Sequence, residues 1–189
     1  AHRQVISGPD SPVRYNAFDR DLQMWVAACL FVGVEDIYQL LHGELTPENA
    51  EHFYRSAWPL GTTLQVTDDQ WPPTRAEFDE YWTTNCATIQ IDDTVRAYLN
   101  DLIDLKMINP LLRVGFAPLL RFLTIGFLAP QFRDALGVTW SPQRQRWFER
   151  LFLLVAFTNR FLPRFIRQGG TMLILADIRR RIRRAKRLI

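Results

Sequence analysis

The chain carries few residues of the kinds that catalyse reactions or bind metals. Its histidines are His2, His42 and His52, and its cysteines are Cys29 and Cys86. A neutral imidazole binds iron, zinc or copper, and a thiolate binds soft metals. The spacings H-E-x-x-H and C-x-x-C are absent, which excludes zinc-peptidase helices and thiolate metal motifs. G-x-G-x-x-G, G-x-x-x-x-G-K-[ST] and G-x-S-x-G are absent too, so no phosphate-binding loop or serine elbow is predicted.

Local context gives the three histidines ordinary roles. Asn49 rather than glutamate precedes His52 by three residues, so the Glu-x-x-His pair of a di-iron bundle is missing. His52 is therefore predicted to be a solvated residue. His42 precedes Gly43 at a predicted helix end, where its positive form suits the helix dipole. His2 is, on local evidence alone, an incidental residue near the N-terminus.

Composition predicts one domain with a substantial core. The chain has 189 residues, of which 48% are hydrophobic, and it holds 13 Phe and six Trp. Either the core is aromatic or a flat apolar ligand is bound. Two cysteines provide no disulfide framework, which fits a reducing cytoplasm, and no signal peptide is visible. The sequence begins without methionine, as if within a helix, so we expect a missing upstream part.

Positive charge is concentrated at the C-terminus. Seven of the 23 basic residues lie within 179–187, and the rest of the chain has a net charge of −4. A basic C-terminal helix is predicted over 171–189, with one apolar face formed by Ile174, Ile178, Ile182 and Ala185. This pattern favours an anionic membrane surface or a protein partner. Nucleic-acid binding is not expected, because no aromatic platform interleaves the arginines.

The longest predicted helix lies between Asp19, a residue that suits a helix N-terminus, and Gly43, a C-cap glycine. Its residues are apolar almost all round, which is typical of a central helix packed against several neighbours. At ~1.5 Å per residue it would be about 35 Å long. Three- and four-residue spacing predicts that one stripe is buried in the core: Leu22, Trp25, Cys29, Ile37 and Leu41.

Helix-start signals recur along the rest of the chain, with capping residues predicted at Thr46 before Pro47, at Thr74, at Asp92 and at Ser141 before Pro142. The chain is therefore predicted to be a single all-α domain of about eight helices around the long central one. Three further helices are expected at 47–61, from residue 75 after the Thr74-x-x-Glu77 capping box, and from Asp92 to Asn109. Three more are expected at 111–127 with a bend at Pro118, at 130–136, and at 142–161. Gly169 and Gly170 are expected to separate the last of these from the C-terminal helix.

Several sequence blocks resemble a known family. In chain order they are HRQVISG, YNAFDRDLQMWVAACL, YRSAWPLGTTLQV, WPPTRAEFDEYW, IDDTVRAYLNDL, RFLTIGFLAPQFRDALGVTW and RFLPRFIR. Their order and spacing are similar to those of the catalytic domain shared by rubber oxygenases (latex clearing proteins) and fungal ER-bound oxygenases of mycophenolic acid biosynthesis. The resemblance is strongest to actinobacterial-type members. It covers essentially all of this chain, but only the C-terminal two thirds of the family domain.

The resemblance implies an all-helical fold around haem b, with a histidine upstream of the central helix as proximal iron ligand. His2 matches that position. The resemblance also implies apolar walls beside the macrocycle, to which Trp25, Phe116 and Phe122 could contribute. Arg121, or Arg113, could then meet the haem propionates. The family's distal motif, an arginine with a nearby lysine and threonine on an upstream helix, has no counterpart in this chain.

Two functions follow as expectations. The first is a haem-dependent, oxygenase-like oxidoreductase acting on an apolar substrate, with isoprenoids as one such class. The alternative is a non-enzymatic, degenerate family member that binds a membrane surface or a protein through its basic C-terminal helix. Under either function, an oligomer or a second chain could complete the domain. Localisation is expected to be cytoplasmic, with membrane association through that helix.

Overall fold

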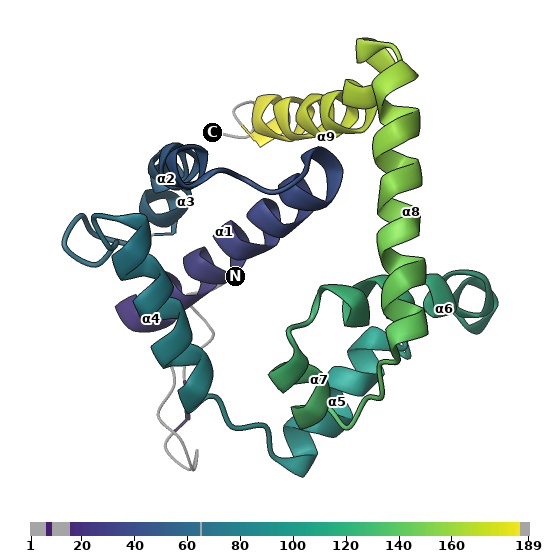
Figure 1. Cartoon of the computed structure of the whole chain (residues 1–189), viewed down its shortest axis with the longest axis horizontal. Coiled ribbons are helices and arrows are strands. Elements are labelled where there is room, and N and C mark those ends of the chain that lie inside the picture. Colours follow the sequence, from purple (N-terminus) through teal and green to yellow (C-terminus); the bar gives the residue numbers. More distant parts are fainter. Residues whose placement is uncertain (1–6, 9–15, 65, 186–189) are drawn as a thin grey trace.

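The computed structural model describes residues 7–8, 16–64 and 66–185, and this part of the chain forms nine helices. The predicted all-α class is confirmed. The helices follow one another around an open centre (Figure 1). Helices α1 to α4 form one half of the ring, α5 to α8 form the other, and α9 extends back from the end of α8. Helix α1 joins the two halves through its contact with α8.

The first half confirms the predicted capping residues. It consists of α1 (Arg20–His42), α2 (Pro47–Ser56), α3 (Trp58–Thr63) and α4 (Arg75–Thr88). The side chains of Asp19, Thr46 and Thr74 accept hydrogen bonds from backbone N–H groups in the first turns of α1, α2 and α4. The single helix predicted for 47–61 is divided after Ser56. Pro59 explains the division, because it has no N–H with which to continue the hydrogen-bond ladder of α2.

The second half contains α5 (Asp93–Ile103), α6 (Pro110–Phe127), α7 (Pro130–Ala135) and α8 (Pro142–Phe161). Asp92 and Ser141 cap α5 and α8 as predicted. The prediction that α5 continues to Asn109 was wrong. Leu105 has φ 53°, and its N–H donates to the carbonyl of Leu102 at 3.0 Å. This left-handed residue ends the helix in the way a C-terminal glycine usually does.

The predicted start of the C-terminal helix was also wrong. Helix α9 spans Arg164–Ala185, so it begins before the expected residue 171 and runs through Gly169 and Gly170. The actual break is at Leu162, which adopts an extended backbone in front of Pro163. A residue before proline avoids the helical region because of steric clash, whereas a glycine inside a helix only lowers its stability.

Helix α1 buries a different face from the one predicted. Its buried residues are Met24, Ala27, Ala28, Phe31 and Glu35, which pack with Tyr54, Trp71 and Phe78 from the rest of the first half. The expected core residues Leu22 and Ile37 are 40% and 44% exposed, and Cys29 is exposed as well. Small Ala27 and Ala28 allow the aromatic side chains to approach the helix closely. An apolar residue on every side of α1 left sequence spacing unable to choose between faces.

A buried ion pair fixes α1 against α4. Glu35 is only 4% exposed and accepts a hydrogen bond from the guanidinium of Arg75, at the start of α4. The same guanidinium donates to Asp79 at 2.8 Å, and the backbone N–H of Arg75 donates to Glu51 of α2 at 3.0 Å. Burial opposes the charge of Arg75, but the hydrogen bonds to Glu35 and Asp79 outweigh it and raise its pKa. One residue thus connects three helices.

A second aromatic cluster holds α6, α7 and α8 together. Phe148 of α8 is buried against Phe122 and Phe127 of α6. Arg133 of α7 donates to the carbonyls of Ile125 and Gly126, both at 2.9 Å, near the end of α6. The ring of Phe148 lies directly over Gly126, so that a β-carbon there would overlap it. Gly126 is therefore needed for the close approach of the two helices.

Two glycines of α6 give a matched test of this packing. Gly126→Ala should lower the free energy of unfolding by about 1–3 kcal/mol, because Phe148 must move to admit a methyl group. Gly115→Ala, where the added methyl meets nothing within 4 Å, should raise it by about 0.5–1 kcal/mol through helix propensity. Urea denaturation of both variants measures these changes. Equal effects at the two positions would contradict the close α6–α8 contact.

The buried ion pair makes a second prediction. Arg75→Ala should lower the free energy of unfolding by roughly 3 kcal/mol, because it leaves the Glu35 carboxylate buried without its partner. Adding Glu35→Gln should recover part of that loss. Arg55→Ala, which removes an exposed pair with Glu51, is the control and should cost under about 0.5 kcal/mol. A double-variant cycle by urea denaturation that finds no coupling between Glu35 and Arg75 would refute the structural role of the pair.

Candidate functional site

Helices α1 and α4 meet through a pair of stacked tryptophans. Trp25 of α1 stacks on Trp82 of α4, with ring centroids 5.0 Å apart and an interplanar angle of 13°. Cys29 and Cys86 follow four residues later on each helix and are close enough for Cys86 to influence the pKa of Cys29. Residues four apart share a helix face, so Trp25 and Cys29 lie on one face of α1, and Trp82 and Cys86 lie on one face of α4. Trp25, predicted from the family resemblance to form a cofactor wall, therefore lies against α4.

A cavity of about 510 Å³ opens next to this contact. Trp82 and Cys86 form part of its wall, and Trp25 stacks on Trp82. The opposite wall comes from α7, including Phe132. The cavity is lined by eight residues, none of them charged: Trp82, Thr83, Cys86, Ala87, Ile89, Gln131, Phe132 and Ala135. Such a lining suits an apolar molecule with few polar groups.

The thiols of Cys86, which lines this cavity, and of Cys29 on α1 are not activated nucleophiles. Cys29 keeps part of its surface exposed, but desolvation by its surroundings, followed by the influence of Cys86, raises the pKa of its thiol to about 11. Burial also raises the pKa of Cys86. The thiolate is the reactive form of cysteine, and both groups remain protonated near neutral pH. Cys86 therefore contributes apolar surface to the cavity rather than covalent chemistry.

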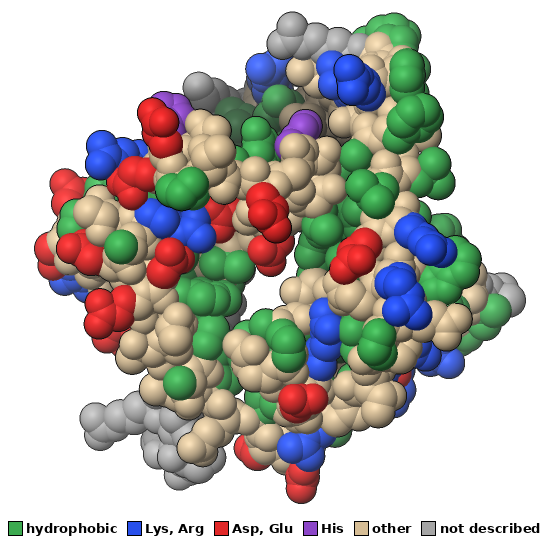
Figure 2. Space-filling model, in the orientation of Figure 1, with side chains coloured by type: hydrophobic (Ala, Val, Ile, Leu, Met, Phe, Trp, Pro, Cys, Tyr) green, Lys and Arg blue, Asp and Glu red, His purple; other side chains and the backbone are tan. Residues whose placement is uncertain are grey.

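The outward face of α1 adds a long apolar surface. Five side chains of this face are between 40% and 50% exposed: Leu22, Val26, Leu30, Val34 and Ile37. A β-carbon at Gly33 would meet only open space. Figure 2 shows hydrophobic side chains bordering the opening through the middle of the molecule. Contiguous apolar surface of this kind marks a place where another molecule or segment binds.

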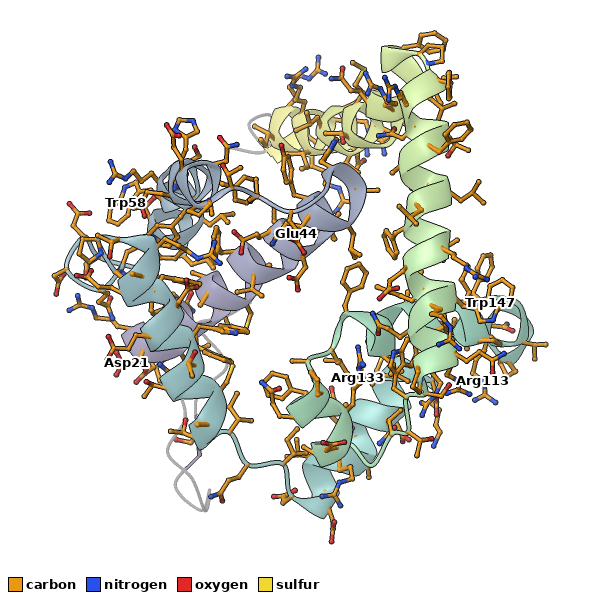
Figure 3. All side chains as sticks on the ribbon, viewed as in Figure 1. Asp21, Glu44, Trp58, Arg113, Arg133 and Trp147 are labelled. Atoms are coloured by element: carbon orange, nitrogen blue, oxygen red, sulfur yellow. The ribbon has the colours of Figure 1, made fainter. Side chains whose placement is uncertain are left out.

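Arg121 lies in a different place from Trp25. It forms an ion pair with Asp104 at 2.6 Å and lines a second cavity of about 390 Å³, together with Lys106 and Arg113. In Figure 3, Arg113 lies beside Trp147 on the outer side of α8, whereas Arg133 lies towards the centre. The structure therefore does not bring Trp25 and Arg121 to one cavity. Asp104 lines the second cavity together with the three cations, so the charged lining is positive by two and suits a carboxylate or another anion.

The remaining predicted site residues have separate positions. His2 lies outside the described residues. His42 packs against Tyr38, with ring centroids 4.7 Å apart, and His52 is exposed on α2. Phe116 is exposed, whereas Phe122 packs against Trp140 and Phe148. Within the described part of the chain, no three His, Cys, Asp or Glu residues are grouped so as to hold a metal ion.

Helix α1 is the one described helix that is long and apolar enough to cross a membrane, with a mean hydropathy of 1.5 in its most apolar window. The same length and composition are found in core helices of soluble proteins. Helix α1 packs its Met24–Phe31 face into the aromatic core and pairs Glu35 with Arg75. Its length and hydropathy are therefore weak evidence for a membrane span.

Sequence reasoning missed the α4 and α7 side of the cavity. Trp82, Cys86 and Phe132 were not predicted as site residues. One available signal was the repeated spacing, because Trp25 and Cys29 are separated by four residues just as Trp82 and Cys86 are. Nothing in the sequence indicates that α7 faces α4, since that arrangement depends on how the two halves of the ring meet.

Comparison with known proteins gives one family and two close relatives. Residues 1–157 match the family described as "ER-bound oxygenase mpaB/B'/Rubber oxygenase, catalytic domain". Uncharacterised proteins of Mycobacterium tuberculosis and Mycobacterium bovis are each 42% identical over all 189 residues, which correspond to 74% of their own length. No solved structure matches the chain. The matched region contains α1, α4 and α7, and hence the whole apolar cavity.

The raised thiol pKa predicts the pH dependence of alkylation. Because the pKa of Cys29 is about 11, its thiolate fraction at pH 8 should be about a hundredfold lower than that of a cysteine with an ordinary pKa of 9. Iodoacetamide labelling of Cys29, followed by peptide mass spectrometry, should rise about tenfold per pH unit between pH 8 and 10. The same chain in 8 M urea, used as the control, should label at the ordinary rate. Rapid labelling of the folded chain at pH 7 would instead identify an activated thiolate.

Proposed function

Because the chain belongs to the family of ER-bound and rubber oxygenase catalytic domains, we propose that it is a haem-dependent oxidoreductase acting on an apolar substrate. The family supports an oxygenase-like function in general. The observation that supports an apolar substrate is the uncharged cavity between α4 and α7, which lies within the matched residues. Isoprenoids are a substrate class of suitable chemistry, since they present hydrocarbon surface and few hydrogen-bonding groups.

The described residues fit a flat apolar cofactor in one respect. The exposed face of α1 carries five large apolar side chains between Leu22 and Ile37. Hydrophobic side chains also border the central opening (Figure 2). We propose that this face forms a wall for haem b and that His2 supplies the iron ligand. Haem would supply the binding and activation of dioxygen. The chain's own residues would exclude water and orient the apolar substrate.

Arg121 has a separate part in the proposal. With Lys106 and Arg113 it lines the basic cavity, and carboxylates such as propionates bind well to guanidinium groups. That cavity is distinct from the one beside Trp25. We therefore treat Arg121 as a candidate carboxylate partner and assign no joint site to Trp25 and Arg121. The effect of replacing Arg121 on haem binding has to be measured separately from the effect of replacing His2.

An absorption spectrum tests the cofactor directly. The chain produced with haem available should show a Soret band, and His2→Ala should lose at least about 90% of the bound haem, because the iron would have no protein ligand. His52→Ala is the matched control and should keep the band, since that histidine is exposed on α2. Arg121→Gln should weaken haem retention without shifting the band.

Oxygen uptake tests the reaction. With an isoprenoid hydrocarbon as substrate, the haem-loaded chain should consume dioxygen, and Trp82→Ala should lower this rate, because it widens the apolar cavity and removes part of the wall that would orient the substrate. An unchanged spectrum and haem content in His2→Ala would refute His2 as the ligand. A chain that binds no haem and consumes no oxygen would support the alternative, a non-enzymatic family member.

A further inference from the structure

Helix α9 is the least covered element of the molecule. None of its described residues is buried, and its apolar side chains Leu173 and Ile174 are 74% and 64% exposed. It begins at Arg164, beyond the end of the matched oxygenase domain at residue 157. The two mycobacterial relatives nevertheless align over the full chain and therefore include it. The exposed surface of α9 therefore lies outside the matched catalytic domain, and its function has to be sought separately.

The junction of α8 and α9 presents three exposed phenylalanines. Phe157, Phe161 and Phe165 are 62%, 70% and 70% exposed, and the rings of Phe157 and Phe161 are 5.0 Å apart. Figure 2 shows hydrophobic side chains gathered at this corner, with basic groups beside them over α9. Exposed aromatic side chains cost free energy in water, but they are favourable at the boundary between lipid headgroups and acyl chains.

The other end of α9 is strongly basic. Arg179, Arg180, Arg181, Arg183 and Arg184 lie within two turns. Arg180 and Arg181 both bind Asp177, at 3.2 and 2.7 Å. Among the described residues, the other three have no carboxylate partner, so their positive charge is directed to solvent. Ile174, Ile178 and Ile182 keep an apolar stripe beside these arginines.

We propose that α9 and the phenylalanine corner bind the surface of an anionic lipid bilayer. The arginines would contact lipid phosphates and anionic headgroups, while Phe161, Phe165 and the isoleucine stripe enter the headgroup–acyl boundary. An anionic bilayer offers both negative charge and apolar depth over one continuous surface, which matches the two parts of this helix. This proposal does not depend on whether the domain binds haem.

Charge favours the bilayer over a second copy of the chain. In a symmetric dimer whose two-fold axis passes near the basic end of α9, the two arginine clusters would face and repel one another. Another mode of self-association would place the arginines of one copy on the mildly acidic body of another. That contact would leave the three phenylalanines without an apolar partner. The oligomeric state is therefore measured in the same experiment.

Vesicle co-sedimentation of the full chain tests the proposal. Binding should be strong to vesicles of phosphatidylcholine with 30% phosphatidylserine, weak to pure phosphatidylcholine, and reduced as salt rises from 0.1 to 0.5 M. The triple variant Arg179→Gln, Arg183→Gln, Arg184→Gln should lose about a hundredfold in affinity. The control variant Arg144→Gln, Arg146→Gln, Arg150→Gln has the same change in net charge at the opposite end of α8 and should bind like the parent chain.

A second variant separates the apolar contribution. Phe161→Ser with Phe165→Ser should lower affinity about tenfold and should remove most of the binding that persists at 0.5 M salt. Circular dichroism would check that each variant keeps its helix content. The proposal is overturned if the triple arginine variant and its control bind equally, or if neutral vesicles bind as well as anionic ones. It is also overturned if sedimentation velocity finds a dimer that the arginine variant disrupts while vesicles do not bind.

Discussion

The contact between Glu35 and Arg75 is the constraint on which the first half of the molecule and the candidate cavity depend. Glu35 is the one carboxylate on the buried face of α1, which is otherwise apolar, and its burial is tolerated only because Arg75 pairs with it. Arg75 stands at the start of α4, so the pair fixes where α4 begins along α1. The stacking of Trp25 on Trp82 follows from that alignment. Without it, the wall that α4 contributes to the cavity would have no fixed position.

The same constraint determines which face of α1 is left uncovered. Glu35 lies on the face of Met24, Ala27 and Phe31, so turning that face inward turns Leu22, Val26 and Ile37 outward. A helix that is apolar all round must expose one apolar face unless neighbours surround it. The backbones of α3 and α8 come closest to α1, and α4 reaches it through side chains. The exposed face is thus a consequence of the polar pairing, and it supplies the apolar border of the central opening.

Features that depend on residues close together in the sequence could be predicted, whereas features that depend on contacts between helices could not. The N-caps Asp19, Thr46, Thr74, Asp92 and Ser141 were found because each depends on a hydrogen bond spanning two or three residues. The buried face of α1 was missed because both faces are apolar and the deciding partner, Arg75, lies 40 residues away. The end of α5 was missed because leucine rarely adopts the left-handed conformation of Leu105. Trp25 was singled out, but its partner Trp82 and the α7 wall depend on the tertiary arrangement.

The two proposals, an apolar substrate site in the oxygenase domain and lipid binding by α9, support one another physically. Apolar molecules are scarce in water and concentrated in bilayers, so an enzyme acting on them encounters substrate mainly at a lipid surface. A basic helix that holds the domain there raises the effective concentration of substrate without adding a contact to the cavity. The arginines of α9 and the uncharged lining between α4 and α7 would then act in sequence, first by charge and then by apolar contact. Salt would weaken only the first step, so it should affect activity on vesicle-borne substrate and leave activity on a small soluble analogue unchanged.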